Sequence, residues 1–389
     1  MKRFIRLGCL IVLIQSTPAC NFLGSETSTP EDSLQFYPPT PKVLDKVLYR
    51  DMFRKTAAFF DTTLDNQQFN GSFLVAKNGA IIFEQYRGAI RLKGKDSIGP
   101  ATPFHIASTS KTFTAMAILK LQEEGKLSLQ DSLQQYFKAF PYKGITIEML
   151  LNHRSGIPNY AYFLENIKWP KDKSVKNQDV LEVLCKSKPG LSFNSNKRFG
   201  YSNTNYVLLA LIIEQVSGKS YADYLETVFF GPLKMQHTKV YSNQDADHVT
   251  PSFRKDGSLE PFTYLDETYG DKNIYSTVRD LLKWDQALYA QKLFSPPTLD
   301  AAFSPYSFEK PGIHNYGLGW RMYLLKDGEK VIYHNGWWHG NNASFYRVLR
   351  DSVTIIVLGN RYNEKIYQVK PLIESLTNLR FKSSDETSL

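Results

Sequence analysis

Hydrophobic and polar positions follow a strand-like pattern at both ends of the chain and a helical period between them. Near the start, the segment GSFLVAKNGAIIFEQYRG (71–88) predicts two strands around Asn78-Gly79. Asn-Gly between two apolar runs is a strong signal for a β-hairpin. A helical pattern over residues 43–64 precedes this hairpin, so we expect a helix and two paired strands to open the folded part of the chain.

The middle of the chain, from about residue 104 to 311, is mostly helical in pattern with long loops. After FHIASTSKTFTAMAIL (104–119), Gly125 suits the left-handed position that ends a helix. The segments TIEMLLNH, NTNYVLLALIIEQVSG and STVRDLLKWDQALYA predict three further helices. Ser202 or Asn203 suits the start of the second of these, and Gly218 suits its end.

Strand patterns return in the last part of the chain. YGLGWRMYLL, KVIYHNG, ASFYRVLR and VTIIVLGN predict an antiparallel meander, and the helical pattern YQVKPLIESLTNLRF closes it. Strands at both ends around a helical middle indicate an α+β fold with one sheet built from both chain ends. We expect a domain over 43–385, with a sheet lobe at about 43–103 and 312–380 and a helical lobe at about 104–311. A cleft between the lobes would be the natural substrate site.

The first nineteen residues differ from the rest. Lys2, Arg3 and Arg6 precede an apolar run at 7–14, and small residues lead to Cys20. This is the pattern of a secretion signal, and the apolar run is too short to span a bilayer. The alternative is a buried N-terminal strand. TPAC resembles a bacterial lipoprotein box, in which Cys20 is lipidated, and cleavage without a lipid stays open. Residues 20–42 predict a flexible tether.

Composition narrows the function classes. The chain has 389 residues, of which 42% are hydrophobic and 22% charged, and this suits a globular domain with a sizeable core. Without the three basic leader residues, 44 basic residues stand against 38 acidic ones, a net charge of +6. The excess is scattered, so we expect no nucleic-acid partner. The seven histidines show no ligand spacing, and we expect no metal and no cofactor. Cys185 is the only cysteine of the body, so no internal disulfide is available.

One pair of residues in the first long helical segment carries candidate chemistry. Ser108 and Lys111 are three positions apart, so on a helix they share one face. A serine hydroxyl is a poor nucleophile until a base removes its proton, and a lysine in suitable surroundings is such a base. Ser252–Lys255 and Ser307–Lys310 have the same spacing. The alternative role for Ser108 is helix capping.

Two further motifs follow downstream. Tyr201-Ser202-Asn203 lies at a predicted loop-to-helix junction, where a phenol can relay a proton and an amide can donate to a substrate carbonyl. His334-Asn335-Gly336 lies at the end of a predicted strand. The glycine there would let a substrate lie against the strand edge.

In this order, Ser-x-x-Lys, Tyr-x-Asn and His-x-Gly resemble the three motifs of the penicillin-recognising serine hydrolases, in the branch of class C β-lactamases, D-alanyl-D-alanine carboxypeptidases and family VIII esterases. GITIEMLLNHRSGIPNY, PGLSFNSNKRFGYSNTNYVLL, YSTVRDLLKW and YGLGW are also similar to segments of this family. The resemblance covers residues 45–380 or so and implies a β-lactamase/transpeptidase-like fold. Ser-x-x-Lys carries the nucleophile of β-lactamases.

The resemblance implies catalytic roles at four positions. Ser108 would attack a carbonyl and form an acyl-enzyme. Lys111, together with Tyr201, would take the serine proton and pass it to the leaving group. The backbone N–H groups of Ser108 and Trp337 would form the oxyanion hole.

The resemblance also implies binding roles and exposes departures. Asn203 would hold the acyl side chain, and His334 would line the far wall where β-lactamases carry lysine, beside Gly336. Trp337-Trp338 replaces small residues of the family and would place large rings at the acyl site. Lys272-Asn273 replaces a pair of family glycines and would reshape the nearby loop.

These observations predict an exported serine hydrolase that acts on an amide or ester through Ser108. Peptides ending in D-Ala-D-Ala rank level with small esters as substrates, and β-lactams rank third. The partners would be this small-molecule or peptide substrate and a membrane, through a lipid on Cys20. The alternative is a catalytically silent binding or scaffold protein of the same fold, tethered outside the cell.

Overall fold

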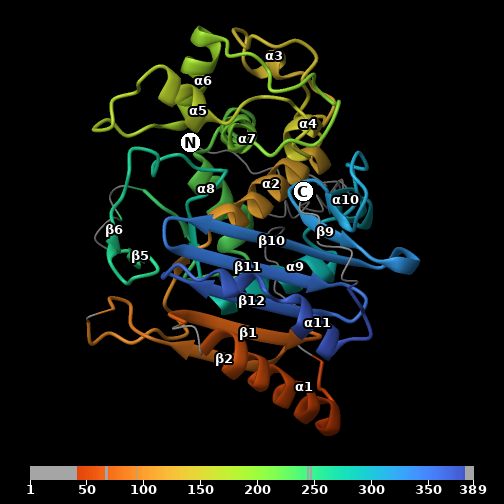
Figure 1. Cartoon of the computed structure of the whole chain (residues 1–389). Helices are drawn as coiled ribbons and strands as arrows, with labels where there is room; N and C mark the ends of the chain where they lie inside the picture. Colours follow the sequence, from red (N-terminus) through yellow and green to blue (C-terminus); the bar gives the residue numbers. More distant parts are fainter. Residues whose placement is uncertain (1–41, 66–68, 93, 243–244, 246–247, 382–389) are drawn as a thin grey trace, which may run out of the picture. The chain divides into compact units, whose positions relative to one another are not determined.

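A seven-stranded antiparallel sheet is built from the two ends of the chain (Figure 1). Its strand order is β2-β1-β12-β11-β10-β9-β8, so the early hairpin joins the late meander by pairing β1 with β12. This confirms the predicted fold class. The strands are β1 (Gly71–Lys77), β2 (Ala80–Arg87), β8 (His314–Tyr316), β9 (Arg321–Leu324), β10 (Lys330–Trp338), β11 (Asn341–Val348) and β12 (Val353–Gly359).

The computed structural model describes residues 42–65, 69–92, 94–242, 245 and 248–381. The predicted signal peptide and all but the last residue of the predicted tether lie outside these ranges, as does Cys20. Within the described residues, no helix is both long enough and apolar enough to cross a bilayer.

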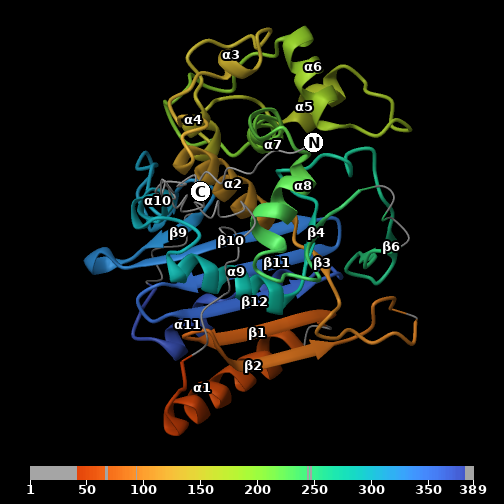
Figure 2. The same ribbon diagram turned by 180° about the vertical axis from the view of Figure 1, so that it is seen from behind.

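Alternate residues of the sheet pack into two separate cores. Leu74, Phe345 and Ile356 belong to the core that contains α2, α7 and α9. Phe73 and Ile355, which point to the opposite face, belong to the core that contains α1 and α11. Figure 1 shows α11 in front of the sheet, and Figure 2, from behind, shows α9 across it. Because both faces are covered, β12 is buried along its whole length.

The helices and short strands have the following bounds. The helices are α1 (Lys46–Phe59, continued by a π-helical turn Phe60–Leu64), α2 (Lys111–Glu123), α3 (Leu133–Tyr136), α4 (Ile147–Leu151), α5 (Tyr160–Asn166), α6 (Asn177–Ser187), α7 (Asn203–Ser217), α8 (Tyr221–Leu225), α9 (Val278–Ala290), α10 (Pro296–Ala302) and α11 (Lys370–Leu376). The short strands are β3 (Phe104–His105), β4 (Lys239–Val240), β5 (Ser252–Phe253), β6 (Leu259–Glu260) and β7 (Ile274–Ser276).

Local sequence signals set several of these boundaries. Asn78 and Gly79 both have positive φ, +52° and +77°, as the predicted two-residue hairpin turn requires. Gly218 ends α7 in the left-handed conformation with φ +68°, and Gly125 follows α2 with φ +67°. Ser202 occupies the N-cap position of α7, but its hydroxyl makes no capping hydrogen bond.

Two predicted elements are shorter than their patterns. YGLGWRMYLL divides into β8 and β9, because Gly319 turns with φ +83° and lies so close to α2 that an added Cβ would be 2.2 Å from Ala115 Cβ. The predicted C-terminal helix over 367–381 is limited to α11, which has Pro371 in its first turn and is preceded by a 3-10 turn, Glu364–Tyr367. Proline suits that position because the N–H it lacks has no intrahelical partner there.

Candidate active site

Ser108 lies in a 3-10 turn, Ala107–Ser110, immediately before α2. Ala107 has a φ of +48°, a left-handed conformation that costs a non-glycine residue about 1–2 kcal/mol. The buried ring of His105 holds this turn, since its Nδ1 accepts a hydrogen bond from Ala107 N–H at 3.1 Å. Burial lowers the pKa of His105 to about 4, so the ring is neutral at pH 7 and its Nε2–H donates to Asn273 Oδ1 at 2.9 Å.

Lys111, the first residue of α2, is fully buried behind the serine. Its Nζ lies 3.2 Å from Ser108 Oγ and donates to the backbone carbonyl of Asp271 at 2.6 Å. The ring centres of Tyr201 and Tyr206 lie 5.0 and 5.5 Å from Nζ. No carboxylate of the described residues forms an ion pair with this amine. In its uncharged form the amine is therefore placed to take the serine proton.

The other serine–lysine spacings do not form such a pair. Ser252 Oγ accepts from Gly340 N–H at 2.7 Å, and Ser307 Oγ accepts from Arg154 Nη1 at 3.2 Å. The capping alternative for Ser108 is not observed either, since α2 has no side-chain cap hydrogen bond. The three-dimensional structure thus singles out one serine among three of equal spacing.

A cavity of about 670 Å³ opens in front of Ser108. Five predicted site residues line it from different elements, together with an arginine that the sequence had not indicated. These six residues are Ser108, Tyr201, Asn203, Arg321, Gly336 and Trp337. Segments from the helical insertion and from both β9 and β10 therefore meet at one cavity.

Tyr201 is held from behind by His153. Their ring centres are 4.3 Å apart, and His153 Nδ1 accepts from Ser202 N–H at 3.2 Å and lies 3.1 Å from Asn205 Nδ2. Burial, reinforced by the charge of Lys111, keeps the pKa of His153 well below its ordinary value. The neutral ring is a packed structural histidine. Asn203 lines the cavity, and its buried Oδ1 has no hydrogen-bond partner in the described structure.

Gly336 on β10 lies against the nucleophile turn. A Cβ added there would be 2.3 Å from the Ile106 carbonyl oxygen and 3.1 Å from Ser108 N. The sequence suggested that this glycine makes room for substrate, whereas in the structure it makes room for the turn that carries Ser108. The approach places Ser108 N–H beside the end of β10, where Trp337 follows.

The expectation that His334 lines the far wall does not match its position. Its side chain is fully buried, with Nε2 3.2 Å from the Tyr316 hydroxyl and Nδ1 2.7 Å from the Asn335 carbonyl oxygen. Side chains alternate along a strand, and the neighbours Tyr333 and Asn335 face the cavity instead. Burial holds the pKa of His334 well below its ordinary value, so the ring is neutral.

Arg321 is the most informative residue that the sequence patterns missed. Its guanidinium lies on the cavity wall, 5.3 Å from the ring centre of Tyr201. Among the described residues, no carboxylate forms an ion pair with it, although Glu260 lines the same cavity. A cation in this state is available to an anionic ligand. Its only sequence signal was its place just after YGLGW.

Asp266 and His339, which the sequence patterns had not indicated, form a second group beside the two tryptophans. Trp337 is 63% exposed at the rim, while Trp338 Nε1 donates to Asp266 Oδ1 at 2.5 Å. His339 Nε2 lies 2.9 Å from the same oxygen. Despite its burial, the pKa of Asp266 is lowered, because His339 and Trp338 donate hydrogen bonds to it. Among the described residues, no three or more His, Cys, Asp or Glu side chains are grouped to hold a metal ion.

Comparison with known proteins identifies the family. Residues 56–373 match the family model described as Beta-lactamase. The chain belongs to this family. The beta-lactamase family membership confirms the resemblance found in the three motifs and places the chain among the serine hydrolases of this fold.

Individual relatives support this assignment to the family. Penicillin-binding protein 4* of Bacillus subtilis (strain 168) is 35% identical over 328 residues, which are 79% of this chain and 72% of that protein. Teichoic acid D-alanine hydrolase of Staphylococcus aureus (strain NCTC 8325 / PS 47) is 30% identical over 264 residues, covering 66% of this chain and 64% of that protein. The crystal structure of a penicillin binding protein from Bacillus halodurans superposes with a TM-score of 0.71 over 86% of this chain and 100% of the other. At 24% identity, that likeness shows the fold alone.

Proposed function

We propose that this member of the beta-lactamase family is a hydrolase that forms an acyl-enzyme at Ser108 and cleaves an amide bond in a D-amino-acid peptide with a free carboxylate. The observation that carries the proposal is the contact of Lys111 Nζ with Ser108 Oγ, 3.2 Å, at a cavity that also presents Arg321. A nucleophile, its base and an anion-binding group thus surround the same space.

The reaction proceeds by acyl transfer to water. Ser108 Oγ attacks the carbonyl carbon as its proton moves to Lys111 Nζ, and the backbone N–H groups of Ser108 and Trp337 stabilise the oxyanion. The C–N bond then breaks, and the proton passes by way of Tyr201 to the departing amine. Water attacks the resulting ester, its proton is taken by the same groups, and the C–O bond to Ser108 breaks to release the acid.

The substrate class follows from the cavity and the relatives together. A peptide that ends in a free carboxylate would pair that group with Arg321 on the leaving-group side, and Asn203 would hydrogen-bond the acyl side. The names of two relatives, a penicillin-binding protein and a teichoic acid D-alanine hydrolase, support a D-alanyl substrate.

A second candidate reaction is hydrolysis of a D-alanyl ester. Such an ester carries an ammonium group instead of a carboxylate, and Glu260 lines the same cavity as Ser108. The staphylococcal relative, which is 30% identical, bears a name that fits this reaction. The two substrates present opposite charges, so charge-altering variants of Arg321 and Glu260 distinguish them.

Intact-mass measurement tests the proposal. The protein is exposed separately to D-Ala-D-Ala peptides, D-alanyl and p-nitrophenyl esters, and cephalosporins, and each adduct is followed with time. We expect an adduct from the peptide that turns over, and none in Ser108→Ala. Equal activity of Ser108→Ala and the wild type on every substrate would instead support a catalytically silent scaffold.

We infer that the protein works at the bacterial cell envelope. The leader pattern and Cys20 support export and a lipid anchor, and the names of the relatives refer to cell-wall chemistry. Cys20→Ser is expected to move the protein from the membrane fraction to the soluble fraction. Unchanged fractionation would rule out the lipid.

A further inference from the structure

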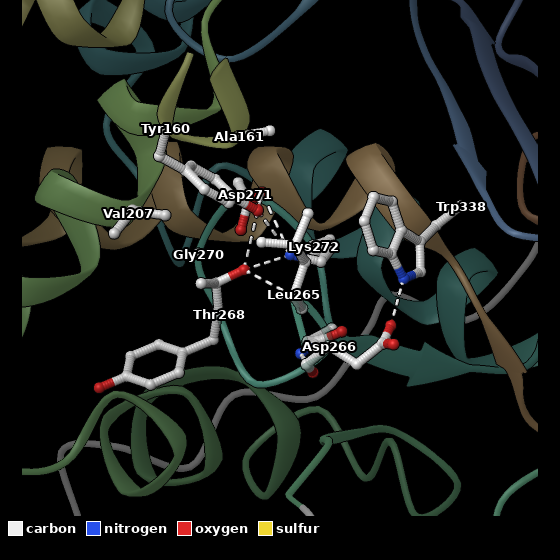
Figure 3. Close-up of polar contacts among 12 residues, drawn as sticks. Tyr160, Ala161, Val207, Leu265, Asp266, Thr268, Gly270, Asp271, Lys272 and Trp338 are labelled. Atoms are coloured by element: carbon white, nitrogen blue, oxygen red, sulfur yellow. Dashed lines mark hydrogen bonds and ion pairs between the residues drawn. The ribbon is translucent and has the colours of Figure 1, made fainter. Parts of the chain in front are cut away.

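A second buried lysine, Lys272, is not used by the reaction scheme, and Figure 3 shows its side chain beside Tyr160 and Asp271. Lys272 is only 3% exposed and directly follows Asp271, whose carbonyl oxygen accepts the hydrogen bond of Lys111 Nζ. A buried ammonium is costly to maintain, so its surroundings require an explanation.

The surroundings of Lys272 satisfy an ammonium group. Its Nζ donates to the hydroxyl oxygens of Tyr160, at 2.8 Å, and Thr268, and lies 3.5 Å from Asp271 Oδ2. The two hydroxyls can accept because their own protons go elsewhere: Tyr160 donates to Asp271 Oδ2 at 3.0 Å and Thr268 to the Leu265 carbonyl oxygen at 3.2 Å. Two N–H bonds of the ammonium therefore find hydroxyl acceptors, and the Asp271 carboxylate pairs with its charge.

The segment that carries Lys272 is attached along the start of α2. Thr114 Oγ1 donates to the Gly270 carbonyl oxygen at 2.7 Å, and Lys111 Nζ donates to that of Asp271 at 2.6 Å. The ion pair with Lys272 holds Asp271 in place. It therefore also holds the backbone carbonyl oxygen of Asp271, which accepts the hydrogen bond that orients Lys111. This acceptor decides where the amine lies relative to Ser108 Oγ, because the two hydrogen bonds share one nitrogen.

Lys272 also contacts the wall of the catalytic cavity. Its Nζ lies 4.6 Å from the ring centre of Trp338, over the indole face, and the other end of this ring is fixed by the Nε1–H···Asp266 hydrogen bond. Trp338 lines both the catalytic cavity and a neighbouring cavity of about 550 Å³, as do Glu260 and His339. A change in the orientation of this ring would therefore change the wall that a substrate meets.

We propose that Lys272 is a positioning residue for the proposed hydrolase: through Asp271 it holds the acceptor of Lys111, and through Trp338 it holds one wall of the substrate cavity. This rests on the proposed function at Ser108. Lys272 acts through other residues and touches neither Ser108 nor the cavity. Its loss is expected to affect nucleophile activation and substrate fit as two separate effects.

Lys272→Met tests both effects, because methionine keeps much of the stem and removes the ammonium. A small fluorophosphonate reports nucleophile activation with little dependence on the wall, and its rate of labelling Ser108 is expected to fall about tenfold or more. With substrates that differ only in the size of the acyl group, KM is expected to change selectively for the bulky one. In a Trp338→Leu background, Lys272→Met should leave the KM ratio unchanged and still slow labelling.

Arg347→Met is the matched control. Arg347 is another buried cation, with its Nε 2.5 Å from Asp285 Oδ1, and it lies outside the catalytic cavity. This variant should lose stability and keep the wild-type labelling rate per folded molecule. Wild-type labelling by Lys272→Met, or a loss of rate no larger than that of Arg347→Met, would overturn the proposal.

Asp271→Asn provides a second route if Lys272→Met does not fold, since it keeps the backbone carbonyl and removes the carboxylate that pairs with Lys272. It is expected to slow labelling as well, and a wild-type rate would again overturn the inference. Absence of labelling in the wild type itself would refute the proposed hydrolase, and the role of Lys272 with it. The two failures are thus distinguishable.

Discussion

Replacing Arg321 with methionine should separate substrates by the charge of their leaving group. The guanidinium lies on the cavity wall without a carboxylate partner in the described structure, so a substrate carboxylate would be its ion-pair acceptor. A hydrogen bond to a charged group contributes about 1.5–3 kcal/mol. We therefore expect Arg321→Met to lower kcat/KM for a peptide ending in a free D-Ala carboxylate by roughly 10- to 150-fold.

The assay compares that peptide with its C-terminal amide, which is the same molecule without the negative charge. Arg321→Met should process the amide at nearly the wild-type rate. Arg279→Met serves as the control, because Arg279 pairs with Glu84 at the surface and does not line the cavity. Equal losses on acid and amide would show that Arg321 supports the cavity wall and does not bind a carboxylate. No loss on either would refute the substrate assignment.

Two further predictions follow from the nucleophile turn. Gly336→Ala should reduce Ser108 labelling by about a hundredfold, because the new Cβ must push the turn away; Gly190→Ala, which meets open space, is the control, and equal labelling of the two would refute the steric argument. His105 should make stability fall with acid. Unfolded histidine binds a proton near pH 6.5, whereas the folded ring does so only near its pKa of about 4, so unfolding free energy should drop by about 2–3 kcal/mol between pH 7.5 and 4.5. Urea unfolding of His105→Gln should show a correspondingly smaller drop, and an identical one would contradict this origin.

Local signals predicted the fold well because they depend on neighbouring residues in the chain. Asn78-Gly79 specified a turn with two positive φ angles, and Gly218 specified the end of α7. The union of the early hairpin and the late strands in one sheet also followed, since strands flanking a helical middle have few other ways to bury both faces. The particular pairing of β1 with β12 did not follow from the sequence. The limits of the short strands did not follow, because they depend on contacts such as that of Gly319 with α2.

The sequence predicted which residues belong to the candidate site better than it predicted how their side chains are arranged. Motif order brought Ser108, Lys111 and Tyr201 together: Ser108 and Tyr201 line one cavity, and Lys111 is buried behind the serine. The direction of His334 could not be read from the motif, because it depends on which face of β10 packs against Tyr316. Arg321 looked like an ordinary charged residue, and only the folded chain shows it at the cavity without a carboxylate partner among the described residues.

The pairing of β1 with β12 has a consequence for biosynthesis. Until the last strands have been synthesised, β1 lacks its neighbour β12 along one edge. Helix α2, which follows Ser108, then lacks the face of the sheet on which it packs. Such sequence-distant pairing slows folding and leaves an aggregation-prone edge open during synthesis. A ribosome-bound fragment ending before residue 314 should accordingly remain protease-sensitive and depend on chaperones. The active-site arrangement around Ser108 would form only when synthesis of the chain is nearly complete.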